Sequence, residues 1–231
     1  MVEERILIDG KQYLLYAEGE PEVLLVEPMD EQDLEFLDRE LEILKAEAVR
    51  PFALAALVIN DWNRELAPWP ADPVFGKELF TGGAPATLRF IEDRLIPKVE
   101  SLFPSLKGGR RIIGGYSLSA LFALWCAYES DSFDGIAAAS PSVWYPGWME
   151  FVRSHNPKAH NVYLSLGDKE YKSRNRTLAT VETCIRDYSE ILSATEGMKT
   201  TLEWNPGNHF VDADLRTARA FMWTLNSISS D

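Results

Sequence analysis

Apolar residues follow two different periods along the chain. Short runs in which most positions are apolar predict β-strands, whereas apolar residues three and four positions apart predict helices. The predicted strands are Arg5–Asp9, Gln12–Tyr16, Glu22–Glu27, Phe52–Ile59, Arg111–Ile113, Gly135–Ala139, Asn161–Leu166 and Thr200–Trp204. Between the first two of these, the Asp-Gly pair predicts a tight hairpin.

Helical patterns alternate with the later strands. About six helices are expected, the clearest of them over residues 34–48, 86–103, 119–128, 178–192 and 212–225. Alternation of strands and helices predicts an α/β fold, with an eight-stranded, mostly parallel sheet and helices on both faces. The chain has no internal repeat and no low-complexity linker, so we expect one domain over residues 1–231.

Composition places the chain among ordinary globular proteins. It has 231 residues, 46% hydrophobic and 26% charged, and a net charge of −13. This acidity argues against nucleic acid or an anionic membrane as a partner. Residues 1–50 carry −10 of it, largely on the polar face of the first helix, while residues 51–231 carry only −3. The net charge therefore says little about a substrate.

Location is predicted from what the sequence lacks. Its apolar runs are shorter than the roughly 18 residues of a membrane span, and Met1–Arg5 is too charged for a signal peptide. Two cysteines, Cys126 and Cys184, are too few for a disulfide framework and favour a reducing cytoplasm. Cys126 lies among apolar residues of a predicted helix, where we expect a buried thiol. The oligomeric state is left open.

The sharpest chemical feature is Gly115-Tyr116-Ser117-Leu118-Ser119, between a short predicted strand and an apolar helix. A serine in such a tight turn presents its hydroxyl at the carboxyl end of the sheet, and glycines before it relieve crowding. The N-terminus of the helix that follows the serine stabilises negative charge that develops there, and the Leu118 N–H is placed to donate to an oxyanion. This pattern is the nucleophile elbow G-x-S-x-G with Ser119 in place of the last glycine. The alternative is an idle serine in a glycine-rich turn.

A serine nucleophile needs a base, and the chain has three histidines. His155 and His160 flank a polar connection and are expected on the surface. His209 follows the last predicted strand and precedes the last helix, which is where the order Ser, Asp or Glu, then His places the general base. The acid should follow the seventh strand, where the sequence offers both Asp168 and Glu170. Spacing alone leaves the choice between them open.

At these residues the sequence resembles the esterase D-like branch of the α/β-hydrolases, which includes enterochelin esterases and feruloyl esterases. The matching segments are residues 114–123, 139–144, 167–170 and 207–210. The resemblance implies an α/β-hydrolase fold and a serine carboxylesterase that forms an acyl-enzyme on a small-molecule ester, with no metal or organic cofactor. It favours Glu170 over Asp168 as the acid, and it makes the Met29 N–H the second oxyanion donor. The connection of about 22 residues after the sixth strand predicts little or no lid.

The resemblance also suggests a substrate pocket. The segment Asn60–Pro70 matches the family's pocket-lining loop, with Arg64 placed to meet a substrate carboxylate or phenolate. Large aromatic residues are expected to form a cleft over the nucleophile, unless they only pack loops together. They are Trp62, Trp69, Tyr116, Trp144, Tyr145 and Trp148.

The substrate is left open among a siderophore lactone, a feruloyl-type ester and a small acyl ester. Two other functions are weighed against ester hydrolysis. An acyltransferase would use the same residues with an alcohol or thiol acceptor, and only water exclusion separates it from a hydrolase. A non-catalytic binding or regulatory protein would retain the fold without a reactive serine.

Overall fold

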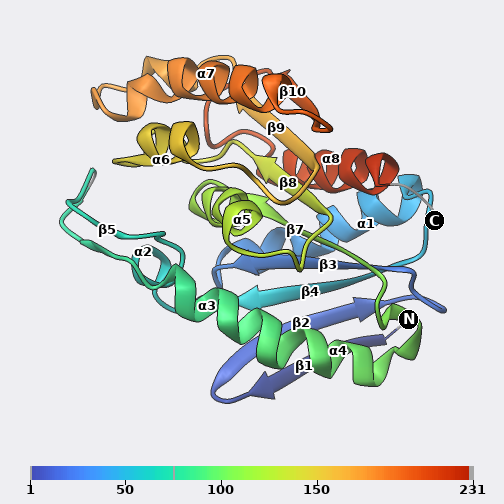
Figure 1. Cartoon of the computed structure of the whole chain (residues 1–231). Coiled ribbons are helices and arrows are strands. Elements are labelled where there is room, and N and C mark those ends of the chain that lie inside the picture. The colour runs from blue at the N-terminus through green and yellow to red at the C-terminus, as the bar shows by residue number, and fades with distance from the viewer. Residues whose placement is uncertain (1, 75, 229–231) are drawn as a thin grey trace.

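A single eight-stranded sheet runs through the molecule (Figure 1). The computed structural model describes residues 2–74 and 76–228. All eight predicted strands are present, in the order β1-β2-β4-β3-β7-β8-β9-β10 across the sheet. Their bounds are β1 Val2–Ile8, β2 Lys11–Ala17, β3 Val23–Met29, β4 Phe52–Val58, β7 Arg110–Tyr116, β8 Gly135–Ala139, β9 Asn161–Gly167 and β10 Lys199–Asn205.

The sheet is mostly parallel, as predicted. The hairpin β1–β2 is antiparallel and joins β4 antiparallel, while β4, β3, β7, β8, β9 and β10 all run in one direction. The carboxyl ends of these parallel strands therefore meet along one edge of the sheet. This edge lies at the left of Figure 1, where the arrowheads of β3 and β4 point.

Helices cover both faces of the sheet. Contacts place α1 beside α8 on one face, while α5 packs on β7 and β8, and α7 packs on β10 and α6 on the other. The α-helices are α1 Leu37–Glu47, α2 Trp62–Glu65, α3 Ala84–Phe90, α4 Ile96–Leu102, α5 Leu118–Glu129, α6 Trp148–Ser154, α7 Val181–Ala194 and α8 Ala213–Ser227. Short 3-10 turns are η1 Asp33–Phe36, η3 Pro104–Leu106, η4 Glu170–Lys172 and η5 Leu178–Thr180, and the π-helical turn η2 is Ile91–Leu95.

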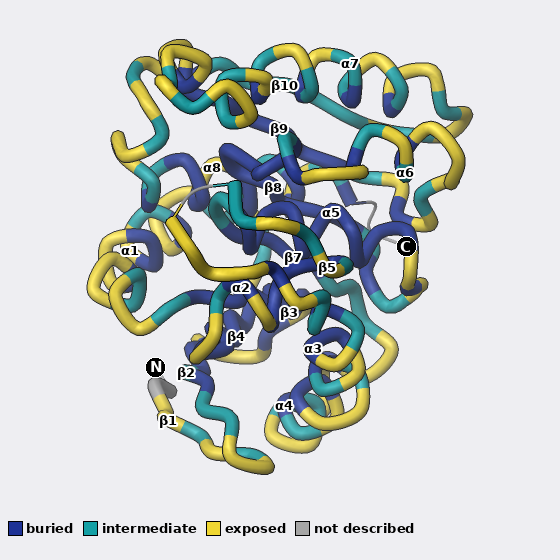
Figure 2. Tube along the Cα trace, turned by 90° about the vertical axis from the view of Figure 1, so that its left-hand side faces the viewer, coloured by how far each residue is buried: buried dark blue, intermediate teal, exposed yellow. Residues whose placement is uncertain are grey.

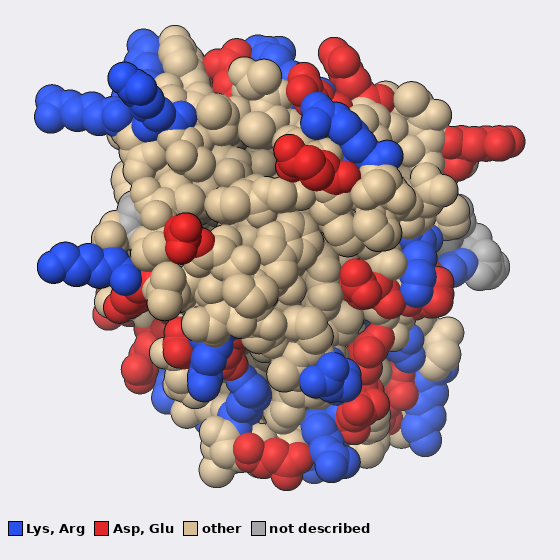
Figure 3. Space-filling view, turned by 60° about the vertical axis from the view of Figure 1, so that its left-hand side comes forward, with Lys and Arg blue, Asp and Glu red and all other residues tan. Residues whose placement is uncertain are grey.

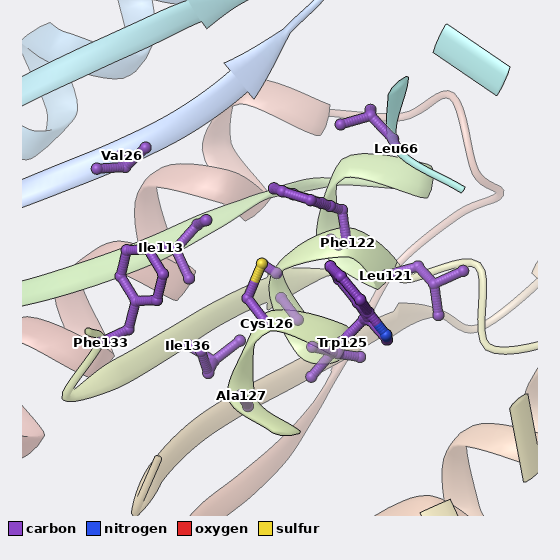
Figure 4. Close-up of a cluster of buried hydrophobic side chains, with 14 of the residues drawn as sticks. Val26, Leu66, Ile113, Leu121, Phe122, Trp125, Cys126, Ala127, Phe133 and Ile136 are labelled. Atoms are coloured by element: carbon purple, nitrogen blue, oxygen red, sulfur yellow. The ribbon is translucent and has the colours of Figure 1, made fainter. Parts of the chain in front are cut away.

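The strands separate two hydrophobic clusters, one on each face. Every residue of β3, β4 and β8 is buried, and the tube in Figure 2 is accordingly dark blue through the middle of the molecule. Cys126 lies in the larger cluster among Phe122, Trp125 and Ile113, as Figure 4 shows. Cys126 is fully buried, which confirms the position predicted for it, and this burial raises the pKa of the thiol well above its ordinary value.

Two connections differ in detail from their predictions. The segment 60–85, predicted as mostly loop, contains α2 and a two-stranded ribbon of β5 Pro70–Ala71 and β6 Phe80–Thr81. The helix predicted over 86–103 is interrupted by η2, immediately before α4, whose second residue Pro97 has no N–H for the ladder.

The connection from β8 to β9 contains one short helix, α6. Among the described residues, no helix is both long and apolar enough to cross a membrane.

Candidate active site

Ser117 occupies a strained turn between β7 and α5. Its φ is +59°. This backbone conformation is energetically unfavourable for any residue other than glycine, and residues that adopt it cluster at functional sites. Gly115 allows the turn to close, because a Cβ atom at that position would overlap the Ser119 hydroxyl. The side chain of Ser117 makes no capping bond to α5, which leaves its hydroxyl available at the carboxyl edge.

Ser119 binds the neighbouring strand. Its buried hydroxyl donates to the Pro28 carbonyl over 2.7 Å. The residue that departs from the glycine of the elbow motif thus ties the end of β3 to the first turn of α5. This bond explains why a hydroxyl is accommodated where the motif has no side chain.

His209 lies between Ser117 and Glu170. Its Nε2 is 3.0 Å from Ser117 Oγ, and its Nδ1 is 2.8 Å from Glu170 Oε2. A carboxylate oxygen only accepts hydrogen bonds, so Nδ1 carries the proton and donates to Glu170. The unprotonated Nε2 is then free to accept the Ser117 hydroxyl, which is the arrangement a general base requires.

Of the two acids that the sequence offered, Glu170 contacts the histidine. It is 9% exposed, and its Oε1 accepts bonds from the Gly167 N–H over 2.7 Å and the Ser140 hydroxyl over 2.9 Å. Asp168 is exposed, and its Oδ1 accepts the Gly207 N–H over 2.8 Å. Asp168 therefore steadies the backbone of the loop that carries His209, without touching the imidazole.

The backbone N–H groups of Leu118 and Met29 were predicted to donate to an oxyanion, but only one of them is free to do so. Leu118 is the first residue of α5, so its N–H lies among the helix donors that have no partner within the helix. Met29 pairs with Val58 in the β3–β4 ladder, and its carbonyl accepts the Ile59 N–H over 2.8 Å. In an extended strand the N–H and the carbonyl of one residue point to the same side, so the Met29 N–H faces β4, as its carbonyl does, rather than Ser117. The ladder thus contradicts the role predicted for Met29.

A cavity of about 630 Å³ opens over Ser117 and His209. Its apolar wall comes from the connection after β8, from α7 and from the histidine loop, and its polar margin comes from the segment around Glu170. The lining residues are Ser117, Trp144, Lys169, Glu170, Lys172, Ser173, Leu178, Val181, Asn208, His209 and Phe210. Figure 3, which brings the carboxyl edge forward, shows a largely uncharged surface in the middle with charged side chains around its margin.

A comparison with known families adds to this geometry. The sequence profile of the family described as "Putative esterase" matches residues 65–210, more than half of the chain and a stretch that contains Ser117, Glu170 and His209. The chain belongs to this esterase family.

Two fungal relatives match shorter stretches of this esterase-family chain. It is 37% identical over 79 residues to the siderophore triacetylfusarinine C esterase of Aspergillus fumigatus, covering 34% of this chain and 26% of that protein. It is 42% identical over 66 residues to the siderophore enterobactin esterase of Emericella nidulans, covering 28% of this chain and 22% of that protein. The matches thus span about a quarter of the length of these relatives.

Solved structures establish the fold. The chain superposes on the IroE-like serine hydrolase from Shewanella oneidensis with a TM-score of 0.78 and 17% sequence identity, over 100% of this chain and 81% of that one. This esterase-family chain therefore has the α/β-hydrolase fold that the sequence predicted.

Most of the aromatic residues predicted for a substrate cleft lie elsewhere. Trp144 lines the cavity, but the Tyr145 hydroxyl donates to the Trp69 carbonyl over 2.6 Å and Trp69 Nε1 donates to Pro146 over 2.8 Å. These two rings, together with the fully buried Trp148, pack irregular segments together, which is the alternative weighed for them.

The other three predicted pocket residues also have different positions. Trp62 and Arg64 line a separate open hollow, where Arg64 pairs with Asp61 at 3.2 Å. Tyr116 is not among the residues that line the cavity, and its hydroxyl donates to the His209 carbonyl over 2.8 Å. The predicted cleft is therefore corrected to one aromatic lining residue, Trp144, from the original set.

Several lining residues were missed by the sequence analysis, although their positions held a signal. Lys169, Lys172 and Phe210 are one or two residues from Glu170 or His209, so adjacency to the acid and the base would have found them. Leu178 and Val181 belong to the amphipathic helix pattern and would be assigned to the core on periodicity alone. Among residues 2–74 and 76–228, no group of three or more His, Cys, Asp or Glu side chains is arranged to hold a metal ion.

Proposed function

We propose that the protein is a serine carboxylesterase that works through an acyl-enzyme. The observation that carries this proposal is the continuous line from Ser117 Oγ to His209 Nε2, at 3.0 Å, and from His209 Nδ1 to Glu170 Oε2, at 2.8 Å. Membership of the esterase family supports it, as does the cavity that opens over the serine. Nucleophile, base and orienting acid in hydrogen-bond reach are the signature of nucleophilic acyl transfer.

In the first half of the reaction, Ser117 Oγ attacks the ester carbonyl carbon while His209 Nε2 takes the hydroxyl proton. The new bond joins Oγ to the carbonyl carbon, and the carbonyl oxygen acquires negative charge. In this proposal the Leu118 N–H and the amino end of α5 stabilise this charge. When the carbon–oxygen bond to the leaving alcohol breaks, His209 returns the proton to that oxygen.

Water reverses these steps in the second half. His209 removes a proton from water as the water oxygen attacks the acyl carbon, and then protonates Ser117 Oγ as the acid product leaves. Glu170 holds His209 in the tautomer with Nδ1 protonated and stabilises the imidazolium formed in each half. An acceptor alcohol or thiol in place of water gives acyl transfer, which product analysis distinguishes from hydrolysis.

The cavity favours esters with an apolar or aromatic acyl group. Trp144, Leu178, Val181 and Phe210 supply apolar contact, and the Phe210 side chain is 89% exposed beside His209. The exposed Lys169 and Lys172 occupy the role predicted for Arg64, that of meeting a carboxylate or phenolate. Siderophore lactones and feruloyl-type esters carry such groups, and the names of the fungal relatives favour the siderophore class.

Hydrolysis of short p-nitrophenyl esters tests the reaction. Wild-type protein should release p-nitrophenol, and Ser117→Ala should lower kcat by at least about 10⁴-fold, because removal of a nucleophile removes the covalent route. Ser193→Ala, which alters an exposed serine on α7, is the matched control and should retain the wild-type rate. An inactive wild-type protein, or a fully active Ser117→Ala variant, rejects the proposal.

A library of esters tests the substrate class. It should include siderophore lactones, hydroxycinnamate esters and neutral esters of similar size. Replacing Lys169 and Lys172 together by Gln should lower kcat/KM about fivefold for anionic esters alone, because exposed charge pairs each contribute up to about 1 kcal/mol. An equal loss for neutral esters would reject the charge-recognition role of these lysines.

A further inference from the structure

Arg216 on α8 is among the most deeply buried charged side chains of the molecule. Its side chain is 1% exposed, although a guanidinium group keeps its charge at any physiological pH. Burying a charge is costly unless hydrogen bonds and an opposite charge compensate for it. The hydrogen-bond and ion-pair partners of Arg216 therefore indicate the function of this buried charge.

One set of these contacts leads to the acid of the proposed triad. Arg216 Nη1 lies 3.3 Å from Glu170 Oε1 and 3.3 Å from the Ser140 hydroxyl. His209 binds the other oxygen of the same carboxylate, Oε2. The arginine and the histidine thus hold Glu170 from its two ends, and the orientation of one oxygen fixes that of the other.

The packing around this pair leaves little room for another arrangement. A Cβ atom at Gly167 would come within 2.5 Å of the Gly207 carbonyl oxygen, 2.9 Å of Glu170 Oε1 and 3.0 Å of Arg216 Nη1. The end of β9 therefore has a glycine where both the backbone of the histidine loop and the ion pair approach it. The site is built around the carboxylate and the guanidinium together.

A second set of contacts leads to the backbone of the histidine loop. Arg216 Nη2 donates to the Pro206 carbonyl over 2.9 Å, three residues before His209. Arg216 Nη1 also donates to the Tyr116 hydroxyl over 3.0 Å, and that hydroxyl donates to the His209 carbonyl. Burial raises the pKa of Tyr116 to about 12, so the hydroxyl keeps the proton it donates. Arg216 is not among the residues that line the cavity.

We infer that Arg216 is a positioning residue, which acts on the reaction by holding Glu170, and through it His209, in line with Ser117. The inference rests on the proposed esterase function and names a residue outside the predicted triad. Because Arg216 acts on His209 mainly through Glu170, its removal should cost much more while Glu170 can orient the histidine than when that carboxylate is absent, where only the bonds to the loop backbone and Tyr116 are lost. A residue that merely supports the fold would matter equally with or without that carboxylate.

A double-mutant cycle separates these roles. Arg216→Met and Arg216→Lys are made in the wild-type chain and in Glu170→Gln, and kcat and KM are measured with p-nitrophenyl acetate per fluorophosphonate-titrated site. In the wild-type chain, Arg216→Met should lower kcat about 10- to 100-fold with KM within about twofold, because small misplacements of catalytic groups cost rates of this order. In the Glu170→Gln chain the same change should cost less than about threefold.

The lysine variant and one control variant keep the test interpretable. Arg216→Lys, which keeps the charge, should recover part of the lost kcat even if Arg216→Met folds poorly. Arg219→Met, which removes a half-exposed arginine of the same helix paired with Glu203, should leave kcat unchanged. An unchanged kcat in folded Arg216→Met, or an equal loss in both backgrounds, overturns the inference. If Ser117→Ala is fully active, the proposed function itself fails, which is a distinct result.

Discussion

Two buried carboxyl groups at the carboxyl edge of the sheet have opposite surroundings. Glu170, just after β9, accepts hydrogen bonds from four donors, two of which are the side chains of Arg216 and His209. Glu27, near the end of β3, is 2% exposed and faces Glu40 of α1, another buried acid. The first carboxylate is surrounded by donors and positive charge, and the second by further carboxyl groups.

The buried Glu27 and Glu40 avoid mutual repulsion by keeping their protons. Burial raises the pKa of Glu27 to about 8, with a further contribution from the charge of Asp33. Burial and the charges of Glu27, Asp214 and Asp33 raise the pKa of Glu40 well above its ordinary value. Arg39 pairs with Asp214 at 3.1 Å at the margin of the group. At neutral pH the pair of glutamates is therefore held by protons rather than by cations.

The contrast shows that burial does not by itself decide what a carboxyl group does. Where the fold supplies donors and a guanidinium, the group serves as an acceptor that orients His209. Where the fold supplies further acids, the group keeps a proton and acts as a polar filler between β3 and α1.

The largest effect is expected at Glu170, the carboxylate held by Arg216 and His209. Glu170→Gln should lower kcat by about 10³- to 10⁴-fold, because an amide does not stabilise the imidazolium or fix the tautomer of His209. Asp168→Asn is the matched control and should cost no more than about threefold, since Asp168 bonds only to the loop backbone. Steady-state kinetics on a p-nitrophenyl ester measure both. A greater loss for Asp168→Asn would exchange the roles assigned to these acids.

At Glu27, the carboxyl group that keeps its proton, the expected effect is on the free energy of unfolding rather than on the reaction rate. An acid whose pKa is raised by folding contributes stability that is complete below its unfolded pKa, near 4.5, and is lost as the pH rises through about 8. The free energy of unfolding should therefore fall by roughly 1 kcal/mol per pH unit across this window because of Glu27.

Glu27→Gln should flatten that decline, while its kcat stays within about twofold of the wild-type value. Urea unfolding between pH 5 and pH 8 measures the slope, with Glu31→Gln, an exposed acid nearby, as the control. Identical slopes for wild type and Glu27→Gln would contradict the proton-held pair.

The smallest effect is expected at the residue that links the two regions. Tyr116 lines the hollow that also contains Glu27 and Glu40, and its hydroxyl bonds to Arg216 and His209. Tyr116→Phe should lower kcat about fivefold, since one hydrogen bond contributes about 1 kcal/mol. Tyr171→Phe, at an exposed tyrosine, should have no effect. A loss as large as that of Glu170→Gln would mean that Tyr116 supports the site by itself.

Much of the architecture could be predicted because it follows from local pattern. The eight strands and their alternation with helices came from apolar runs, and the elbow motif together with chain order indicated Ser117 and His209. The single domain over residues 1–231 and the cytoplasmic location stay predictions. So do the catalytic roles, for which the observed distances provide a geometric basis.

The rest depended on contacts that sequence does not encode locally. Arg216 lies in an amphipathic helix, where an arginine is normally exposed, and only the tertiary fold buries it beside Glu170. The direction of the Met29 N–H depends on its pairing with β4, and the resemblance gave no register. Aromatic residues were assigned to a cleft by type, whereas Tyr145 and Trp148 belong to the core.

Covalent labelling of Ser117 by a fluorophosphonate tests the central claim most directly. The rate is followed by intact mass, and the modified peptide is identified, for wild type, His209→Gln and Glu27→Gln. Wild type and Glu27→Gln should each gain one adduct on Ser117 at the same rate, while His209→Gln should react at least about 100-fold more slowly, because it lacks the base. An adduct on another residue, no adduct, or an equal rate in His209→Gln would contradict the account.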